Sequence, residues 1–376
     1  MVNKNRLIKT FCELAKIKSP SGKEIVIARK IESILKNCGL SVKRDSYGNI
    51  VAKFAGKGKP LIFCAHMDTV SVGAGKKINL IVGKKKISSD GTTILGADNK
   101  DSIAAILEAV RVLNEQKLAH RPLELVFTRE EEAISRGAKN LDFSLLKGKE
   151  CIISDFSHPY GAIVQSAPGL YQFEARIKGK RCHVKEPEKG VNAILVAADA
   201  IKKMPLGRID EFTTANVAYQ IGGLRGLTDA PRTSIEEITT GNRNTVPDIS
   251  IILGEVRGAK KENIKRALVK IQKIFSNSAK KFNAKIKFNE RKLSDGYFFQ
   301  KNDPLLLMAK NVFKKQNVKC ELRHTLGGTD ANIFNGRGIR SIVISSASRN
   351  NHQNSEYLII RDLEKLAEFY IIAATI

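Results

Sequence analysis

The 376-residue sequence lacks an apolar run long enough for a transmembrane helix. Such a helix needs about 18 or more consecutive apolar residues, so no membrane span is expected. The basic residues at the N-terminus are not followed by a continuous apolar segment, which argues against a secretory signal. None of the six cysteines forms a Cys-X-X-Cys pair, so neither a zinc knuckle nor a disulfide framework is indicated. These absences predict a cytoplasmic protein with reduced thiols.

Acidic residues are scarce relative to basic ones, with 38 Asp and Glu against 64 Lys and Arg and a formal net charge of +26. An excess of this kind attracts polyanions. The basic residues are spread along the chain, however, and tryptophan is absent. No RNP, helix-turn-helix or zinc-finger pattern occurs either. We therefore expect a lysine-rich solvated surface and no specific nucleic-acid partner.

The length favours two domains. Residues 1–167 alternate strand-like and helix-like patterns, and residues 102–113 have the 3.6-residue period of a buried helix face. This alternation is typical of an α/β domain with a largely parallel sheet. Residues 168–294 follow the order β-α-β-β-α-β of a split βαβ domain, with an extra loop at 224–240. The α/β pattern resumes in residues 295–376, so the second domain is inserted into the first.

Polar signatures interrupt the first domain, and several of them directly follow apolar, strand-like runs. They are His66-Met67-Asp68, Gly96-Ala97-Asp98, Glu131-Glu132, Asp155 and His352. In an open α/β sheet, ligands bind outside the carboxyl ends of the strands. Histidine and carboxylate side chains are ligands that borderline divalent metals prefer. Each signature alone is more typical of a cap, a turn or an exposed histidine, but together they predict a two-metal hydrolase.

The same segments carry a resemblance to a known family. Residues beside the signatures belong to the same motifs: Phe63-Cys64-Ala65, Thr69-Val70, Asn99-Lys100, Gly137-Ala138 and residues 352–356. Four further motifs lie elsewhere in the chain: Gly179-Lys180-Arg181-Cys182-His183, Asn244-Thr245-Val246-Pro247-Asp248, Gly254-Glu255-Val256-Arg257 and Gly327-Gly328-Thr329-Asp330. With these motifs the chain resembles the M20 family of zinc metallopeptidases, and most of all its peptidase T-like (tripeptidase) branch. The resemblance implies a zinc-peptidase-like catalytic domain with a mixed, mostly parallel sheet, and an inserted α+β, ferredoxin-like domain that acts as a lid or in dimerisation.

The resemblance also implies two divalent metal ions, most naturally zinc, with cobalt or manganese as alternatives. One metal would be held by His66, Asp98 and Asp155, and the other by Asp98, Glu132 and His352. Asp98 would thus bridge the two metals.

Further residues receive catalytic and substrate-binding roles from the same resemblance. Glu131 would be the general base, Asp68 would support His66, and His183 would stabilise the oxyanion, either within one chain or across a homodimer. The substrate would be contacted by Asn244, Arg257, Gly327, Gly328 and Thr329. One departure from the family pattern, Asp101-Ser102, places an additional carboxylate near the site.

The resulting prediction is an aminopeptidase that removes the N-terminal residue of tripeptides. An M20-type dipeptidase, carboxypeptidase or N-acyl amino-acid deacylase would share the metal core and remains an alternative. An M42-type aminopeptidase is disfavoured, because its extra domain would lie between His66 and Asp98, which are only 32 residues apart here. A more remote alternative is a non-catalytic polyanion-binding protein on the same fold.

Overall fold

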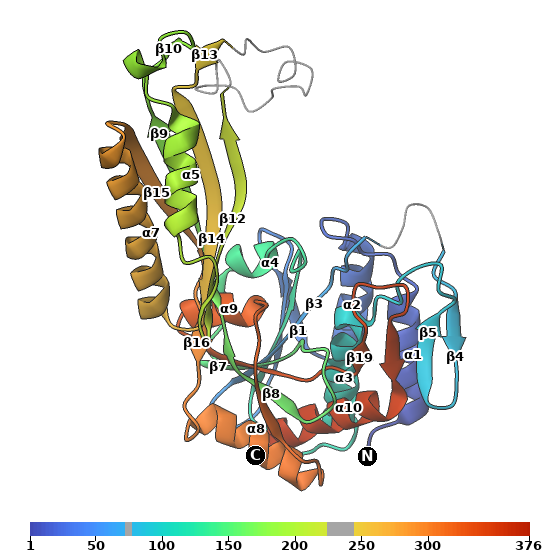
Figure 1. Ribbon diagram of the computed structural model, residues 1–376. Helices are drawn as coiled ribbons and strands as arrows, with labels where there is room; N and C mark the ends of the chain where they lie inside the picture. The colour runs from blue at the N-terminus through green and yellow to red at the C-terminus, as the bar shows by residue number, and fades with distance from the viewer. Residues whose placement is uncertain (72–76, 224–243) are drawn as a thin grey trace. The chain divides into compact units, whose positions relative to one another are not determined.

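The computed structural model describes residues 1–71, 77–223 and 244–376, so the loop expected at 224–240 lies outside the described residues. The chain divides into two compact units (Figure 1). The first comprises Met1–Ser166 with Phe298–Ile376, and the second comprises Ala167–Tyr297. In the described parts of the chain, no helix is both long and apolar enough to span a membrane.

The first unit is built on a nine-stranded sheet in the order β1-β2-β6-β3-β7-β18-β8-β16, with β17 beside β8. The strands are β1 (Ser41–Arg44), β2 (Ile50–Phe54), β3 (Leu61–His66), β6 (Leu123–Thr128), β7 (Glu150–Ser154), β8 (Ala162–Ala167), β16 (Tyr297–Phe298), β17 (Glu321–His324) and β18 (Arg340–Ile344). The central strands β6, β3, β7 and β18 run parallel, whereas β1 and β2 form an antiparallel hairpin. The predicted α/β class with a mixed, mostly parallel sheet is confirmed.

Every residue of β3 and of β6 is buried, as expected for parallel strands that are covered on both faces. The helices of this unit are α1 (Lys4–Ala15), α2 (Ile25–Asn37), α3 (Ala97–Glu115), α4 (Arg136–Lys139), α8 (Pro304–Lys315), α9 (Asp330–Gly336) and α10 (Ile360–Thr375), with a 3₁₀ helix η1 (Phe143–Leu145). Helix α3 packs against α1, α10 and β3, while α2 lies against β1 and β2, and α9 against β18.

A small four-stranded sheet also belongs to the first unit, and the sequence patterns do not predict it. Its order is β19-β20-β5-β4, with bounds Ser348–Arg349, Tyr357–Ile359, Lys86–Ser89 and Leu80–Val82. Strand β20 pairs with both β19 and β5. This pairing brings the loop between β19 and β20, which carries His352, next to the segment that leads into α3.

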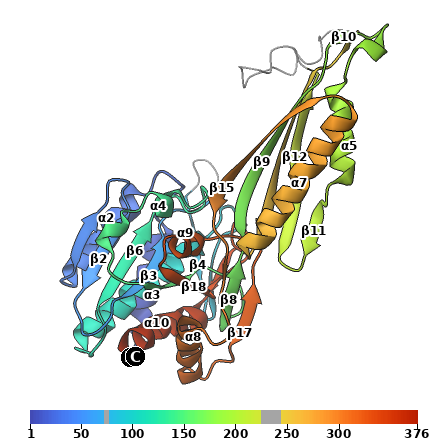
Figure 2. The same ribbon diagram turned by 90° about the vertical axis from the view of Figure 1, so that its left-hand side faces the viewer.

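The second unit has a five-stranded antiparallel sheet in the order β11-β12-β14-β9-β15. Its elements are β9 (Gly169–Lys178), β10 (Cys182–His183), η2 (Pro187–Lys189), α5 (Ala193–Lys203), β11 (Gly207–Asp210), β12 (Thr213–Gly222), β13 (Thr245–Val246), β14 (Ile249–Gly258), α7 (Lys261–Lys281) and β15 (Lys285–Ser294). Helices α5 and α7 lie side by side on one face of the sheet (Figures 1 and 2). Alternate residues of β9 pack with the apolar faces of α5 and α7 in one hydrophobic core. The split βαβ arrangement is confirmed.

Candidate metal centre and catalytic site

Three of the polar signatures meet at one edge of the large sheet. Strand β3 runs parallel to β6 on one side and to β7 on the other. His66 is the last residue of β3, Asp155 directly follows β7, and Glu131 and Glu132 follow β6 after a two-residue interval. Because the carboxyl ends of parallel strands lie at the same edge of a sheet, these side chains are brought close together.

The imidazole of His66 is oriented by the backbone of Asp68, two residues beyond the end of the strand. Its Nδ1 lies 2.9 Å from the carbonyl oxygen of Asp68. A carbonyl oxygen can only accept, so in the neutral ring the proton is on Nδ1 and the lone pair is on Nε2. That nitrogen lies 3.1 Å from Asp98 Oδ1 and 4.0 Å from Asp155 Oδ1. Three lone-pair atoms thus point at one another, which is the arrangement of ligands around a cation.

The carboxylate of Asp98 lies between the two histidines. Its Oδ1 faces His66, and its Oδ2 lies 3.4 Å from His352 Nε2. The turn that carries Asp98 is held by the buried carboxylate of Glu356, which accepts the backbone N–H groups of Gly96, Ala97 and Asp98 at 2.7, 3.0 and 3.1 Å. Asp98 is therefore placed to serve two metal ions at once.

His352 completes a second group of ligand atoms. Its Nε2 lies 2.8 Å from Glu132 Oε1, yet this buried oxygen has no partner in hydrogen-bond geometry. Two ligand atoms so close without a hydrogen bond are again typical of a pair that shares a cation. Besides a group of His66, Glu131 and Glu132, two groups have ligand atoms within 4.8 Å of one another and share Asp98: His66, Asp98 and Asp155, and Asp98, Glu132 and His352. They contain all five side chains that were predicted to bind metal.

The charges of the cluster also fit divalent cations. Across the described ranges of the chain, no Lys or Arg forms an ion pair with Asp98, Glu131, Glu132 or Asp155. Burial, together with the nearby carboxylates, raises the pKa values of Glu131 and Asp155 well above their ordinary range. Bound cations would be the largest local charges and would reverse these shifts. The donor set is therefore suited to metal ions.

The carboxylate of Asp68 makes contacts that the sequence did not predict. Besides its Oδ1 at 3.4 Å from His66 Nδ1, it accepts the backbone N–H groups of Glu131 at 2.9 Å and Glu132 at 3.1 Å. It also accepts the Ser21 hydroxyl at 2.6 Å. Asp68 thus connects the end of β3, at His66, to the backbone of Glu131 and Glu132.

The loop of Gly327, Gly328 and Thr329 lies between β17 and α9, where Thr329 caps α9 by accepting the N–H of Ala331. The next residue, Asp330, is buried and accepts the hydroxyl of Thr128 at 2.5 Å. Burial raises the pKa of Asp330 to about 6. Since Thr128 is the last residue of β6, this bond anchors the loop beside the glutamate pair. Asp330 had no predicted role, although it closes the Gly-Gly-Thr-Asp motif.

Three other predicted residues belong to the second unit. His183 is exposed on β10, and its Nδ1 accepts the backbone N–H of Lys185 at 3.2 Å. The proton of the neutral ring is therefore on Nε2, which can donate. Asn244 is exposed beside β13, where its carbonyl oxygen accepts the N–H of Val184. Arg257 lies near the end of β14 and pairs with Glu255 at 2.8 Å.

The additional carboxylate of Asp101 is engaged elsewhere. It is buried and accepts the backbone N–H groups of Ser102, Ala347 and Ser348 at 2.7 to 3.0 Å. Burial raises the pKa of Asp101 to about 7. These contacts connect α3 to the segment before β19, so Asp101 has a structural role and is not a metal ligand.

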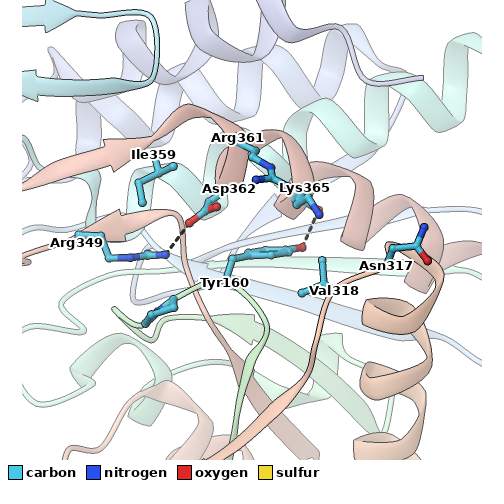
Figure 3. Close-up of a pocket in the computed structure, with 9 residues that line it drawn as sticks. Tyr160, Asn317, Val318, Arg349, Ile359, Arg361, Asp362 and Lys365 are labelled. Atoms are coloured by element: carbon cyan, nitrogen blue, oxygen red, sulfur yellow. Dashed lines mark hydrogen bonds and ion pairs between the residues drawn. The ribbon is translucent and has the colours of Figure 1, made fainter.

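A cavity of about 400 Å³ lies elsewhere in the first unit (Figure 3). It is lined by Pro159, Tyr160, Asn317, Val318, Arg349, Ile359, Arg361, Asp362 and Lys365. Arg349 pairs with Asp362 at 2.6 Å, and the Tyr160 hydroxyl donates to the backbone oxygen of Lys365 at 2.8 Å (Figure 3). None of the predicted site residues lines this cavity.

An α/β unit with imidazoles and carboxylates gathered at the carboxyl ends of its parallel strands has the architecture of a metal-dependent hydrolase. Comparison with known families gives the particular group. The model of peptidase family M20/M25/M40 matches residues 62–375, and the chain belongs to this family. The resemblance found in the sequence motifs is thereby confirmed.

Individual proteins agree with this assignment over nearly the whole chain. The sequence is 33% identical over 382 residues to YqjE of Bacillus subtilis (strain 168), covering 99% of this chain and 98% of that protein. The fold is similar to the crystal structure of aminopeptidase PepT from Bacillus cereus ATCC 10987, with a TM-score of 0.89 and 31% identity, over 100% of this chain and 98% of the other. A tripeptidase from Staphylococcus aureus subsp. aureus Mu50 gives a TM-score of 0.86 and 30% identity at the same coverage.

Proposed function

We propose that this member of the M20 peptidase family is a metal-dependent aminopeptidase that removes the N-terminal residue of tripeptides. The observation that carries the proposal is the pair of ligand groups that share Asp98, with Glu131 beside them. The similarity to an aminopeptidase and to a tripeptidase, each at 30% identity or more over the full chain, supports the choice of substrate.

In this proposal two metal ions occupy the two ligand groups, with His66 and Asp155 on one side of Asp98 and Glu132 and His352 on the other. Zinc is the natural choice for imidazole and carboxylate ligands, and cobalt or manganese can replace it. When bound, the metals would polarise the scissile carbonyl group and lower the pKa of the attacking water.

The proton transfers are assigned to Glu131. Its carboxylate belongs to neither of the two ligand groups that share Asp98, and its backbone is held by Asp68. It can therefore accept the proton of the attacking water and deliver it to the leaving amine, as a general base and then a general acid. The loop of Gly327, Gly328 and Thr329, anchored beside it through Asp330, would contact the substrate.

The second unit is proposed to act as the lid and dimerisation domain. His183 and Arg257 lie toward opposite ends of its sheet, since β14 runs from Ile249, close to β10 and β13, to Gly258. Eight residues of strand separate Ile249 from Arg257, at roughly 3.3 Å each or about 26 Å in total. An extended tripeptide spans only about 10 Å. One copy of the unit therefore cannot supply both residues to one substrate, and His183 would act on the partner chain of a homodimer.

Mixed dimers test this arrangement. Glu131→Gln and His183→Ala chains, each inactive as a homodimer, should regain about a quarter of wild-type activity when mixed in equal amounts, because half of the dimers are mixed and each has one intact site. The measurement is tripeptide hydrolysis by co-expressed, differently tagged chains. A monomer by light scattering, or no recovered activity, would contradict the arrangement.

Substrate length and the terminal amine are tested with matched di-, tri- and tetrapeptides, each with free and acetylated N-termini, and with zinc- or cobalt-loaded protein. We expect cleavage of free-amino tripeptides with release of the first residue. Cleavage of acetylated substrates would instead indicate a deacylase or carboxypeptidase, and preferred cleavage of dipeptides would indicate a dipeptidase. No cleavage with any metal would favour the polyanion-binding alternative.

A further inference from the structure

Glu131 and Glu132 lie on an irregular turn after β6, outside any helix or strand. After β6, residues 129–132 pass through a backbone that is left-handed at Glu130, with φ of 49°. That region is unfavourable for a residue with a side chain. The turn closes where Gly137 donates to the carbonyl oxygen of Arg129 at 2.9 Å. A Cβ on Gly137 would lie only 2.0 Å from the same oxygen, so no larger residue fits.

Side chains from distant segments accept the four successive N–H groups of this turn. Asn49 accepts that of Arg129 at 3.0 Å, and Glu24 accepts that of Glu130 at 3.2 Å. Asp68 accepts the next two, as described above. The path of the turn is therefore fixed by three side chains, and Glu24 holds the residue with the unfavourable φ.

Glu24 is itself built into the fold. It is fully buried at the start of α2, and one carboxylate oxygen also accepts the N–H of Gly22 at 2.7 Å. The other oxygen accepts Arg129 Nε at 2.8 Å. The same guanidinium donates to the carbonyl oxygens of Tyr47 at 2.8 Å and Gly22 at 3.2 Å. Glu24 thus holds the side chain of Arg129 through the ion pair and the backbone of Glu130 through its N–H group.

We propose that Glu24 is a positioning residue for the Glu131–Glu132 pair, which it holds in place through Arg129 and the backbone of Glu130. This inference rests on the proposed function, in which Glu131 is the general base and Glu132 is a metal ligand. Loss of the Glu24 charge would let the turn relax at Glu130, and a shift there displaces both following carboxylates. Groups that orient a metal ligand without contacting the metal typically contribute 10- to 100-fold to metal affinity or to activity.

The chain offers a closely matched control in Glu108. It is also fully buried, accepts Arg6 Nε at 2.8 Å, and accepts one backbone N–H, that of Asn3, at 2.9 Å. It lies on α3, ten residues beyond Asp98, and the regular helix from Lys100 to Glu108 alone spans about 12 Å. Glu108→Gln therefore removes an equivalent buried ion pair without touching the turn.

The test compares Glu24→Gln with Glu108→Gln in three measurements: the melting temperature, the cobalt content and visible absorption spectrum, and the kcat and KM for a free-amino tripeptide. Both variants should lose stability. Only Glu24→Gln should lower kcat by about 10- to 100-fold with KM changed less than about twofold, alter the cobalt spectrum and release metal from the site of Glu132. Arg129→Lys, which keeps a cation but loses the guanidinium bonds, should change kcat and the spectrum in the same direction.

The proposal is overturned if Glu24→Gln keeps the kcat and cobalt spectrum of Glu108→Gln. If Glu24→Gln does not fold, an unchanged kcat and spectrum in Arg129→Lys overturns it. An inactive wild-type protein would contradict the proposed function alone, because the cobalt spectra of the variants would still report on the position of the turn.

Discussion

Glu131→Gln is expected to lower kcat by about a thousandfold while two metal ions stay bound. Glutamine has nearly the shape of glutamate but cannot accept the proton of the attacking water, and general base catalysis typically contributes 10²- to 10⁴-fold. The metals should remain because Glu131 lies outside both ligand groups that share Asp98. Steady-state kinetics on a tripeptide and metal analysis of the purified variant measure the two effects separately.

The control for this variant is Glu108→Gln, which neutralises a buried carboxylate far along α3 and should keep kcat near the wild-type value. Activity of Glu131→Gln within about tenfold of wild type would exclude Glu131 as the general base, given the usual size of that contribution.

Asp98→Asn is expected to have the second large effect, the loss of metal from both sites and of all measurable activity. The two carboxylate oxygens of Asp98 face His66 at 3.1 Å and His352 at 3.4 Å, so one substitution weakens both groups. An amide is a poorer ligand than a carboxylate for zinc, which takes nitrogen, sulfur and carboxylate oxygen donors. The measurement is metal content after gel filtration, together with activity in added zinc.

Asp101→Asn provides the comparison, since Asp101 is a buried carboxylate only three residues away that bonds backbone N–H groups. It should keep two metals and lose stability. Retention of both metals by Asp98→Asn, or their loss in Asp101→Asn alone, would contradict the assignment of the bridging ligand.

The parts of the site that the sequence could predict are those set by regular strands. His66, Glu131, Glu132 and Asp155 follow apolar runs that form β3, β6 and β7. Because these strands are parallel neighbours, the ends of the runs become neighbours in space. The long strands of the second unit were predictable from their alternating pattern, since alternate residues of β9 are buried.

The parts that the sequence could not predict depend on contacts between distant side chains and backbone. His352 lies in the loop between strands β19 and β20, which have two and three residues and are too short to show a period. Helix α3 begins at Ala97, five residues before the predicted start, and is kinked at Asp98 and Asn99, where Glu356 accepts the N–H groups of residues 96–98. The role of Glu24 could not be predicted either, since its partners Arg129 and Glu130 lie more than a hundred residues away in the sequence. Periodicity carries no information about such bonds.

The central claim is that two metal ions share Asp98 in this site. The most direct measurement is a crystal structure of zinc-loaded protein with data collected at the zinc absorption edge. The account predicts two anomalous peaks, one in contact with His66 and Asp155 and the other with Glu132 and His352, both in contact with Asp98. A single peak, or peaks only at other residues, would contradict it.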